Sequence, residues 1–243
     1  MLFTSVVGST NDWAKALAKL GAIEGTVVSA EVQTAGHGRL CRKWVSPKGG
    51  LYFSVILKPK LEPSEAIKLV FVAGLAVVGA LQQLYSLKAE TKWPNDVLIN
   101  GQKICGILSE MSTVGREVKY VVLGVGINAD FDVRKALPKE LRVSATSLQN
   151  ELGIKVDLND LFRVVLEKLE CAYKLFLEKG FATVLNEWKK YARFLRRQVE
   201  VTSGAEKLFG LALDVDEEGS LILKLENNVT RRIFVGDVTL REK

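Results

Sequence analysis

Histidine and cysteine are scarce in this chain of 243 residues, which contains one histidine, His37, and three cysteines. The cysteines, Cys41, Cys105 and Cys171, are odd in number and far apart, which fits neither a disulfide framework nor a zinc site and predicts free thiols. Because the single histidine has no partner at metal-ligand spacing, it is interpreted as a loop residue and not as a metal ligand or a general base.

Membrane and secretion signals are also missing. The longest apolar run, residues 69–81, is shorter than the roughly 20 residues that cross a bilayer, so it predicts a buried helix. The first turns carry Asn11, Asp12 and Lys15 in place of a basic start and an apolar stretch, so no signal peptide is expected. With 48% apolar residues for a core, the sequence predicts a globular protein in the cytoplasm with no membrane partner.

The two common nucleotide-binding motifs are not found. No GxxxxGK[ST] sequence occurs, which excludes a P-loop. The segment Gly124-Val125-Gly126-Ile127-Asn128 lacks the third glycine and the following helix of a Rossmann fingerprint. Its two glycines lie on one face of a predicted strand, so a flat group is expected against them. If this chain binds phosphate, it does so in another way.

Positive charge is concentrated in one window of the chain. No acidic residue occurs between Glu31 and Glu62, and within this window Gly36 and Gly38 allow backbone amides to approach a ligand closely. Arginine forks suit phosphate oxygens, so residues 36–44 predict a phosphate-binding loop, with a solvated basic surface as the alternative. The window contains six cationic residues: Arg39, Arg42, Lys43, Lys48, Lys58 and Lys60.

A second polar cluster is Lys92-Trp93-Pro94-Asn95-Asp96, followed by Lys103. Pro94 fixes a turn, Asn95 can bind a base edge or a phosphate oxygen, and Asp96 can hold a magnesium-bound water or orient a lysine. The alternative interpretation is an ordinary Asx turn.

The apolar pattern predicts an α+β fold with a mixed, mostly antiparallel sheet covered by helices, followed by a small β-barrel. Expected strands span 3–7, 26–32, 51–57, 88–92, 97–99, 104–111 and 119–127. Expected helices span 11–20 (capped by Ser9 or Thr10), 64–84 (capped by Ser64), 158–178 (capped by Asp157) and 182–195, and 130–157 is expected to be irregular. Expected barrel strands span 199–202, 208–214, 221–225, 231–235 and 238–240.

Two domains are expected, 1–195 and 196–243. From Arg196 onward the chain has 8 basic and 9 acidic residues, so the positive net charge of the chain comes entirely from the first domain, which has 26 basic and 19 acidic residues. This balance argues against a C-terminal nucleic-acid module.

The motifs together resemble biotin protein ligases in order and spacing, over most of the chain. The matching segments are Ser9-Thr10-Asn11, Gln33, Gly36 to Trp44, Lys92 to Asp96, Lys103, Gly106 and Gly124 to Asn128. The resemblance implies a class II synthetase-like fold, shared with lipoate ligases, and an SH3-like C-terminal barrel. It implies that biotin and ATP, with Mg²⁺, form biotinyl-5'-AMP and pyrophosphate, and that biotin then passes to a lysine of a biotin carboxyl carrier protein or domain, such as that of acetyl-CoA carboxylase.

The same resemblance implies roles for individual residues. The expected catalytic residues are Lys103, Arg39 and Arg42. The expected biotin-binding residues are Ser9, Thr10, Asn11, Gln33, Gly36, His37, Gly38, Arg39, Lys103, Gly106, Gly124 and Gly126. The expected ATP-binding residues are Arg39, Arg42, Trp44, Lys92, Asn95, Asp96, Lys103 and Asn128, with Asp96 also the candidate for the metal.

Two positions depart from the pattern: Cys41 stands where glycine is expected, and His37 stands where arginine is frequent. No room precedes Ser9 for a helix-turn-helix domain, so a short form with no DNA partner and no repressor role is expected. A homodimer is expected, with a sheet edge near Val121 as a possible contact. The alternatives are a lipoate ligase and a nucleic-acid-binding module that uses the basic surface and the barrel.

Overall fold

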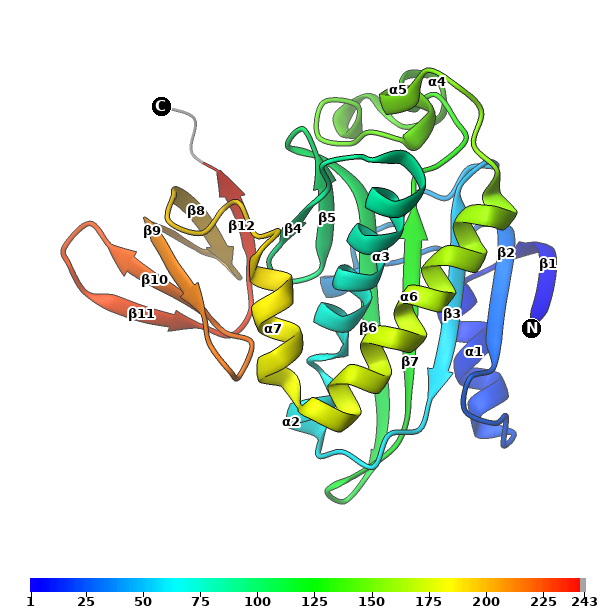
Figure 1. Cartoon of the computed structure of the whole chain (residues 1–243), viewed down its shortest axis with the longest axis horizontal. Coiled ribbons are helices and arrows are strands. Elements are labelled where there is room, and N and C mark those ends of the chain that lie inside the picture. The colour runs from blue at the N-terminus through cyan, green and yellow to red at the C-terminus, as the bar shows by residue number, and fades with distance from the viewer. Residues whose placement is uncertain (241–243) are drawn as a thin grey trace.

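A seven-stranded sheet forms the centre of the molecule, with its strands in the order β1-β2-β3-β7-β6-β5-β4 (Figure 1). The structure, a computed structural model, describes residues 1–240, so the last three residues of the predicted C-terminal domain lie outside it. β1 and β2 pair in parallel, and the other neighbours in this sheet pair antiparallel, which confirms the predicted mixed sheet. The strands are β1 (Leu2–Val7), β2 (Val27–Gln33), β3 (Leu51–Leu57), β4 (Glu90–Lys92), β5 (Asp96–Ile99), β6 (Gln102–Val114) and β7 (Glu117–Ile127).

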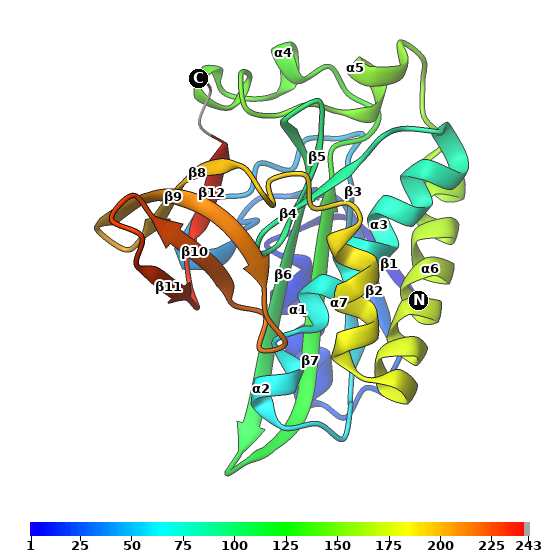
Figure 2. The ribbon, with the colours of Figure 1, turned by 60° about the vertical axis from the view of Figure 1, so that its left-hand side comes forward.

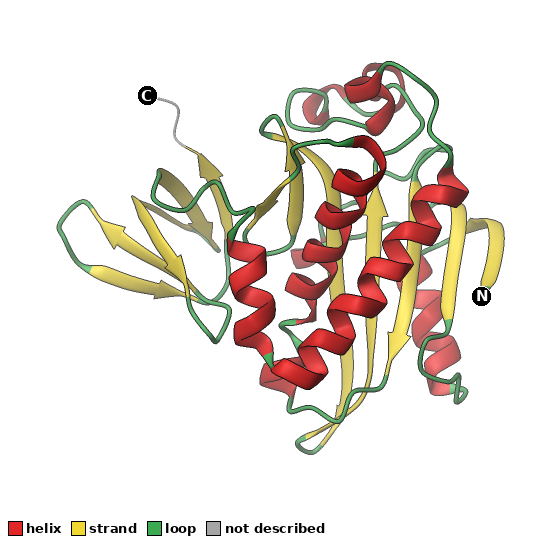
Figure 3. Ribbon diagram, in the orientation of Figure 1, coloured by secondary structure: helices red, strands yellow, loops and turns green. Residues whose placement is uncertain are grey.

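Helices cover both faces of this sheet, as Figures 1 and 3 show. On one face α1 (Thr10–Lys19) packs Ala14 and Ala18 against Val28, Ile56 and Val122 of three neighbouring strands. On the other face lie α3 (Leu69–Tyr85), α6 (Leu158–Lys179) and α7 (Phe181–Lys189), which enclose the main core. Because β3 is covered on both sides, all seven of its residues are buried, which explains its unbroken apolar sequence.

The helix predicted over 64–84 is two helices, α2 (Pro63–Ala66) and α3, and Ser64 is not its cap. Glu62 is the N-cap and Pro63 is the first helical residue, since the fixed φ of proline suits that position and its missing N–H needs no partner there. At the break, the side chain of Lys68 is buried and pairs with Glu65. The segment Pro63–Tyr85 is long and apolar enough to span a membrane, but 67% of its most apolar window is buried inside the protein, where it forms core.

Three short helices occupy the segment that was predicted to be irregular. They are α4 (Val133–Ala136), the 3-10 helix η2 (Lys139–Leu141) and α5 (Leu148–Leu152). The side chains of Asp132 and Ser147 cap α4 and α5, a local signal that the apolar pattern did not reveal because each helix spans only one turn or little more. The prediction for 182–195 was too long, since α7 ends at Lys189 and the following residues turn so that Phe194 packs on Trp188.

The C-terminal part is a separate antiparallel sheet of five strands, in the order β11-β10-β9-β8-β12 (Figure 2). Two of its contacts to the first part are a hydrogen bond from Trp93 Nε1 to the carbonyl of Gly219, 2.8 Å, and an ion pair between Lys189 and Asp214, 2.7 Å. These contacts hold the C-terminal sheet directly against the first part. The strands are β8 (Gln198–Ser203), β9 (Glu206–Val215), β10 (Leu221–Leu225), β11 (Thr230–Ile233) and β12 (Asp237–Leu240).

The expected sheet edge near Val121 is wrong. Val121 is fully buried in β7, which lies between β3 and β6. The order of strands along the chain does not reveal that β7, a later strand, inserts between β3 and β6 in the middle of the sheet. The edge strands are β1 and β4.

Candidate active site

One cavity of about 440 Å³ collects almost all of the predicted site residues. Its lining combines the start of α1, the loop after β2, the ends of β4 to β7 and the first residues of β12. Gly36 is the one predicted site residue that does not line it. A side chain at Gly36 would meet the carbonyl of Trp44 at 2.7 Å, so this glycine serves the close packing of the loop on itself. The predicted residues in the lining are Ser9, Thr10, Asn11, Gln33, His37, Gly38, Arg39, Arg42, Trp44, Lys92, Asn95, Asp96, Lys103, Gly106, Gly124, Gly126 and Asn128.

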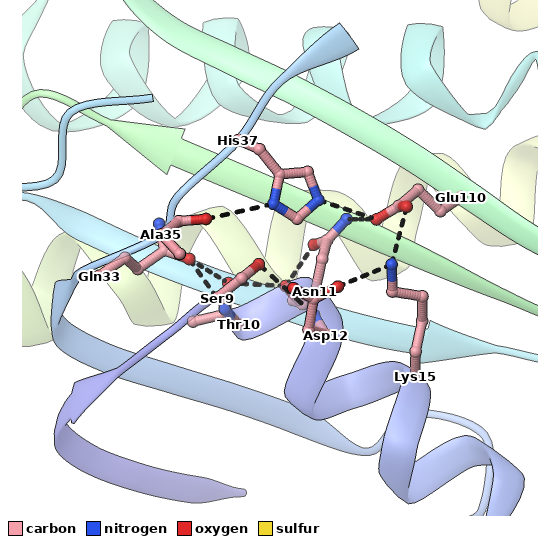
Figure 4. A network of polar contacts seen from close by, with 10 residues as sticks. Ser9, Thr10, Asn11, Asp12, Lys15, Gln33, Ala35, His37 and Glu110 are labelled. Atoms are coloured by element: carbon pink, nitrogen blue, oxygen red, sulfur yellow. Dashed lines mark hydrogen bonds and ion pairs between the residues drawn. The ribbon is translucent and has the colours of Figure 1, made fainter. Parts of the chain in front are cut away.

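One end of the cavity, called the deep end here, is lined by the buried residues Ser9, Thr10 and Asn11 together with Gln33, and Figure 4 shows their polar contacts. The backbone N–H and the hydroxyl of Thr10 both donate to Gln33 Oε1, at 2.8 and 3.1 Å, and Gln33 Nε2 donates to Ser46 at 2.9 Å. The hydroxyl of Ser9 accepts a bond of 3.4 Å from the backbone of Asp12 and so caps α1. The predicted capping role of Ser9 is confirmed, and its side chain also faces the cavity.

Next to Thr10, Asn11 links the deep end to Glu110, a residue that the sequence did not single out. Ser54 Oγ lies 2.6 Å from Asn11 Oδ1, and Asn11 Nδ2 donates to Glu110 at 2.8 Å. Glu110 also accepts from Lys15 at 2.8 Å and lies 3.6 Å from His37 Nε2. Burial alone would raise the pKa of Glu110, but the hydrogen bonds from Lys15 and Asn11 hold it below its ordinary value. This carboxylate therefore ties α1 to β6 and lies beside His37 of the glycine loop, residues 36–44.

The glycines of β6 and β7 allow the cavity walls to approach the sheet. A Cβ on Gly124 would lie 2.0 Å from Asn11 Oδ1, and one on Gly126 would lie 2.6 Å from the indole nitrogen of Trp44. A Cβ on Gly106 would meet the same indole ring at 2.9 Å. The flat group expected against these glycines is therefore, in this structure, the side chain of Trp44. Its indole N–H is buried and has no hydrogen-bond partner among the described residues.

Lys103 and Asp96 form the centre of the charged half of the cavity. Lys103 Nζ lies 2.7 Å from Asp96 Oδ1 and 5.2 Å from the centre of the Trp44 ring. Lys92 Nζ lies 3.9 Å from the other oxygen of Asp96. Burial lowers the pKa of Lys92, against the opposing attraction of Asp96. Asp96 thus holds two lysines close together. Because two positive charges face one negative charge, this part of the cavity can bind a further anion.

The arginines of the glycine loop are held by the C-terminal sheet. Arg42 Nη1 lies 2.6 Å from Asp237 Oδ2 at the start of β12, and Arg39 Nη1 lies 3.8 Å from Asp237 Oδ1. Arg39 also donates to Asn95 Oδ1 at 3.1 Å and to the carbonyl of Gly236 at 3.3 Å. Burial lowers the pKa of Arg39, which keeps its charge because its ordinary value is so high. Sequence reasoning missed Asp237, because it sought site residues within the first domain.

Cys41, which stands where the family pattern has glycine, has a backbone conformation that favours glycine. Cys41 has φ of +57° and its neighbour Leu40 has φ of +54°, both in the left-handed region. Glycine adopts this region at little cost, whereas a side chain adds about 1–2 kcal/mol per residue. The glycine expected at Cys41 is therefore the residue that this backbone favours.

Two further predicted site residues, Asn128 and Asp96, are held by contacts inside the protein. Asn128 donates to the carbonyl of Thr146 at 2.9 Å, which ties β7 to the segment before α5. Both oxygens of Asp96 face lysines, so its contacts favour the orienting role over direct metal binding. In residues 1–240 no three His, Cys, Asp or Glu side chains form a group that could hold a metal ion.

Comparison with known proteins agrees with this geometry. The Biotin/lipoate A/B protein ligase family matches residues 3–128, and the biotin protein ligase C-terminal domain matches residues 195–241. The chain belongs to the biotin protein ligase family. The Bacillus subtilis protein described as "Bifunctional ligase/repressor BirA" is 34% identical over 241 residues, which cover 99% of this chain and 74% of that protein.

Two further biotin protein ligases match this chain over most of their own length. The "Biotin--[acetyl-CoA-carboxylase] ligase" of Paracoccus denitrificans is 34% identical over 220 residues, covering 89% of this chain and 90% of that one. A biotin protein ligase from Aquifex aeolicus, solved in complex with biotin and ATP, superposes with a TM-score of 0.83 at 30% identity, over 100% of this chain and 98% of that chain. The chain is accordingly a ligase enzyme, and the predicted fold class is confirmed.

Proposed function

We propose that this enzyme catalyses both steps of protein biotinylation at the single cavity described above. In the first, a carboxylate oxygen of biotin attacks the α-phosphorus of ATP, forming a P–O bond while the bond to the β-phosphate oxygen breaks and pyrophosphate leaves. In the second, the neutral amine of a carrier lysine attacks the acyl carbon, forming an amide while AMP leaves and the amine loses a proton. The proposal rests on one observation: the buried polar deep end and a cluster of cations lie in the same cavity.

The deep end is suited to the ureido ring of biotin. Thr10 and Ser9 are each only 4% exposed and, with Gln33, present hydroxyl and amide groups to a narrow slot. A ureido group can donate and accept hydrogen bonds there, whereas the dithiolane ring of lipoate cannot. A ureido group buried without a partner would cost about 1–3 kcal/mol, and these residues offer it partners that a dithiolane ring does not use, which favours biotin over lipoate.

The charged half is suited to the triphosphate and to the carboxylate that attacks it. Displacement at phosphorus needs positioning and charge neutralisation more than a protein nucleophile. Lys103 is the residue proposed to bridge the biotin carboxylate and the α-phosphate, and Arg39 and Arg42 are proposed to bind phosphate oxygens. Because no carboxylate cluster accompanies Asp96 in the described residues, Mg²⁺ is proposed to enter with ATP, held mainly by phosphate oxygens.

The nucleoside is proposed to occupy the part of the cavity between Asn128 and the segment before α5. Leu98, Leu137 and Leu141 also line the cavity, and their side chains can give apolar contact to a base. Trp44 is proposed to pack against the adenylate after leaving the position that it occupies beside Gly126, since that position and a bound ring compete for the same space.

The proposal also covers the roles of the two domains, the location of the protein and its oligomeric state. Residues 1–195 would form the catalytic domain and residues 196–243 the SH3-like domain, in the cytoplasm and without a repressor role. A homodimer is proposed to form through the edge strand β1 instead of Val121, because Leu2, Phe3 and Val6 are 43%, 64% and 57% exposed on it. Sedimentation of the purified protein tests this contact, and a monomer at all concentrations would contradict it.

The decisive experiment is incubation of the protein with Mg²⁺, ATP and either biotin or lipoate, followed by native mass spectrometry. Biotinyl-adenylate with biotin alone is the expected product. Lipoyl-adenylate would identify the sister activity, and no adenylate with either acid would contradict the proposal. In the last case, salt-dependent RNA or DNA binding without ATP would support the nucleic-acid alternative.

A further inference from the structure

The mouth of the cavity is defined by those lining residues that are exposed. At the deep end Ser9, Thr10 and Asn11 are each 4% exposed, so a large partner cannot enter there. Of the lining residues on the opposite side, the side chain of Arg42 is 61% exposed and Leu141 is 37% exposed. Any protein that delivers an amine to the cavity must therefore contact the surface around the glycine loop and η2.

This surface carries a concentration of cations. From Arg134 to Arg142 the chain has four basic residues and one acidic residue, Glu140. Lys135 is 87% exposed, and its contact to Asp132 is long at 3.8 Å. Lys139 is exposed and has no ion pair within residues 1–240, and the same holds for Lys43, which lines the cavity from the glycine loop.

Apolar side chains accompany these cations. Leu40 is 62% exposed at the tip of the glycine loop, and Val143 is 83% exposed just beyond η2. These apolar side chains can bury contact area with a partner, and the exposed cations around them favour a partner of negative charge. Small substrates do not need contacts this far from the deep end of the cavity, whereas an incoming protein domain does.

We infer that this rim, formed by Leu40, Lys43, Lys135, Lys139 and Val143, is the docking surface for the carrier domain, and that the carrier presents carboxylates around its target lysine. This inference rests on the proposed function. The charge on the rim raises the rate of encounter with an acidic partner and orients it with the target amine toward the cavity. The apolar residues then bury contact area around that amine.

A single-turnover transfer assay tests the inference. Biotinyl-adenylate is formed first on the enzyme, and either a biotin carboxyl carrier domain or free lysine is then added as the acceptor. The double variant K135E/K139E is compared with K179E, which reverses an exposed charge at the far end of α6, away from α4 (Figure 1). Neither Lys135 nor Lys139 lines the cavity, so adenylate formation should be unchanged in all three proteins.

The expected result is that K135E/K139E lowers the second-order rate of transfer to the carrier about tenfold or more at low salt, whereas K179E does not. Transfer to free lysine should be equal in all proteins, and added salt should reduce the difference. Unchanged transfer to the carrier, or an equal loss with free lysine or in K179E, would overturn the inference. Failure of the unsubstituted protein to form adenylate would instead contradict the proposed function, so the two failures are distinguishable.

Discussion

The ammonium group of Lys103 lies 2.7 Å from Oδ1 of Asp96, and both side chains face the cavity. Asp96 also faces Lys92, so that a single carboxylate at the start of β5 positions two cations from β4 and β6, the strands on either side of it. Because the carboxylate neutralises only part of this charge, a phosphate or a substrate carboxylate can bind beside it.

Replacement of Lys103 by alanine should abolish adenylate formation while leaving the fold intact. The charge that develops at the α-phosphate would lose its nearest cation, and the rate should fall by about 10²-fold or more. Pyrophosphate release measures the rate, and circular dichroism checks the fold. The control K119A removes a lysine from an exposed surface pair and should have normal activity. Normal turnover by K103A would refute the assigned role.

Replacement of Asp237 by asparagine should raise the KM for ATP, by about tenfold, with a smaller effect on the KM for biotin. Arg42 and Arg39 would lose the negative charge of their shared partner, and the contacts of Arg39 to Asn95 and Gly236 would remain, so the loop would have to be ordered more by the nucleotide itself. The matched control is Asp214→Asn, which breaks the pair with Lys189 between the same two parts of the chain but outside the cavity. Both exposed pairs should contribute only about 0–1 kcal/mol to stability, so equal effects on KM would argue against a specific role for Asp237.

Replacement of Cys41 by glycine should stabilise the protein by about 0.5–1 kcal/mol. Glycine removes the steric cost of a side chain at φ of +57°, and this gain exceeds the extra freedom of glycine in the unfolded chain. Thermal unfolding measures the change. Cys41→Ala retains a Cβ and so serves as the control, which should show little or no gain. If alanine stabilises as much as glycine, the thiol and not the backbone is the cause.

As the pH rises, nucleotide binding should weaken at a lower pH than expected for a lysine with an ordinary pKa. Burial lowers the pKa of Lys92, so its charge is lost at a lower pH as the pH rises. The sign for stability is opposite: the unfolded chain binds this proton more tightly, so the cost of burying the charged form is present below the lowered pKa and is relieved above it. A pH profile of the KM for ATP tests the first statement. Lys92→Arg should hold its charge and flatten the alkaline rise, and an identical profile in both proteins would exclude Lys92 as its source.

Local signals in the sequence were sufficient for most elements of the fold. The apolar run 51–57 matches β3, and Asp157 caps α6 as predicted, because burial on both faces and capping leave marks on neighbouring residues. The signals failed where the outcome depended on distant parts of the chain. The break between α2 and α3 lies beside Glu218 of the C-terminal sheet, and β7 lies inside the sheet instead of at its edge.

The sequence by itself determined the chemistry of the site, because glycine spacing, clustered cations and the Lys92 to Asp96 motif are properties of short segments. Only the tertiary structure decided which residues complete it. Glu110 binds the lining residue Asn11 from β6, and Asp237 reaches the cavity from the C-terminal sheet, and nothing near them in the chain marks them as partners of Asn11 and Arg42. A single carboxylate in a strand is common, and its meaning depends on the cation placed opposite to it, which is set by folding and not by sequence separation.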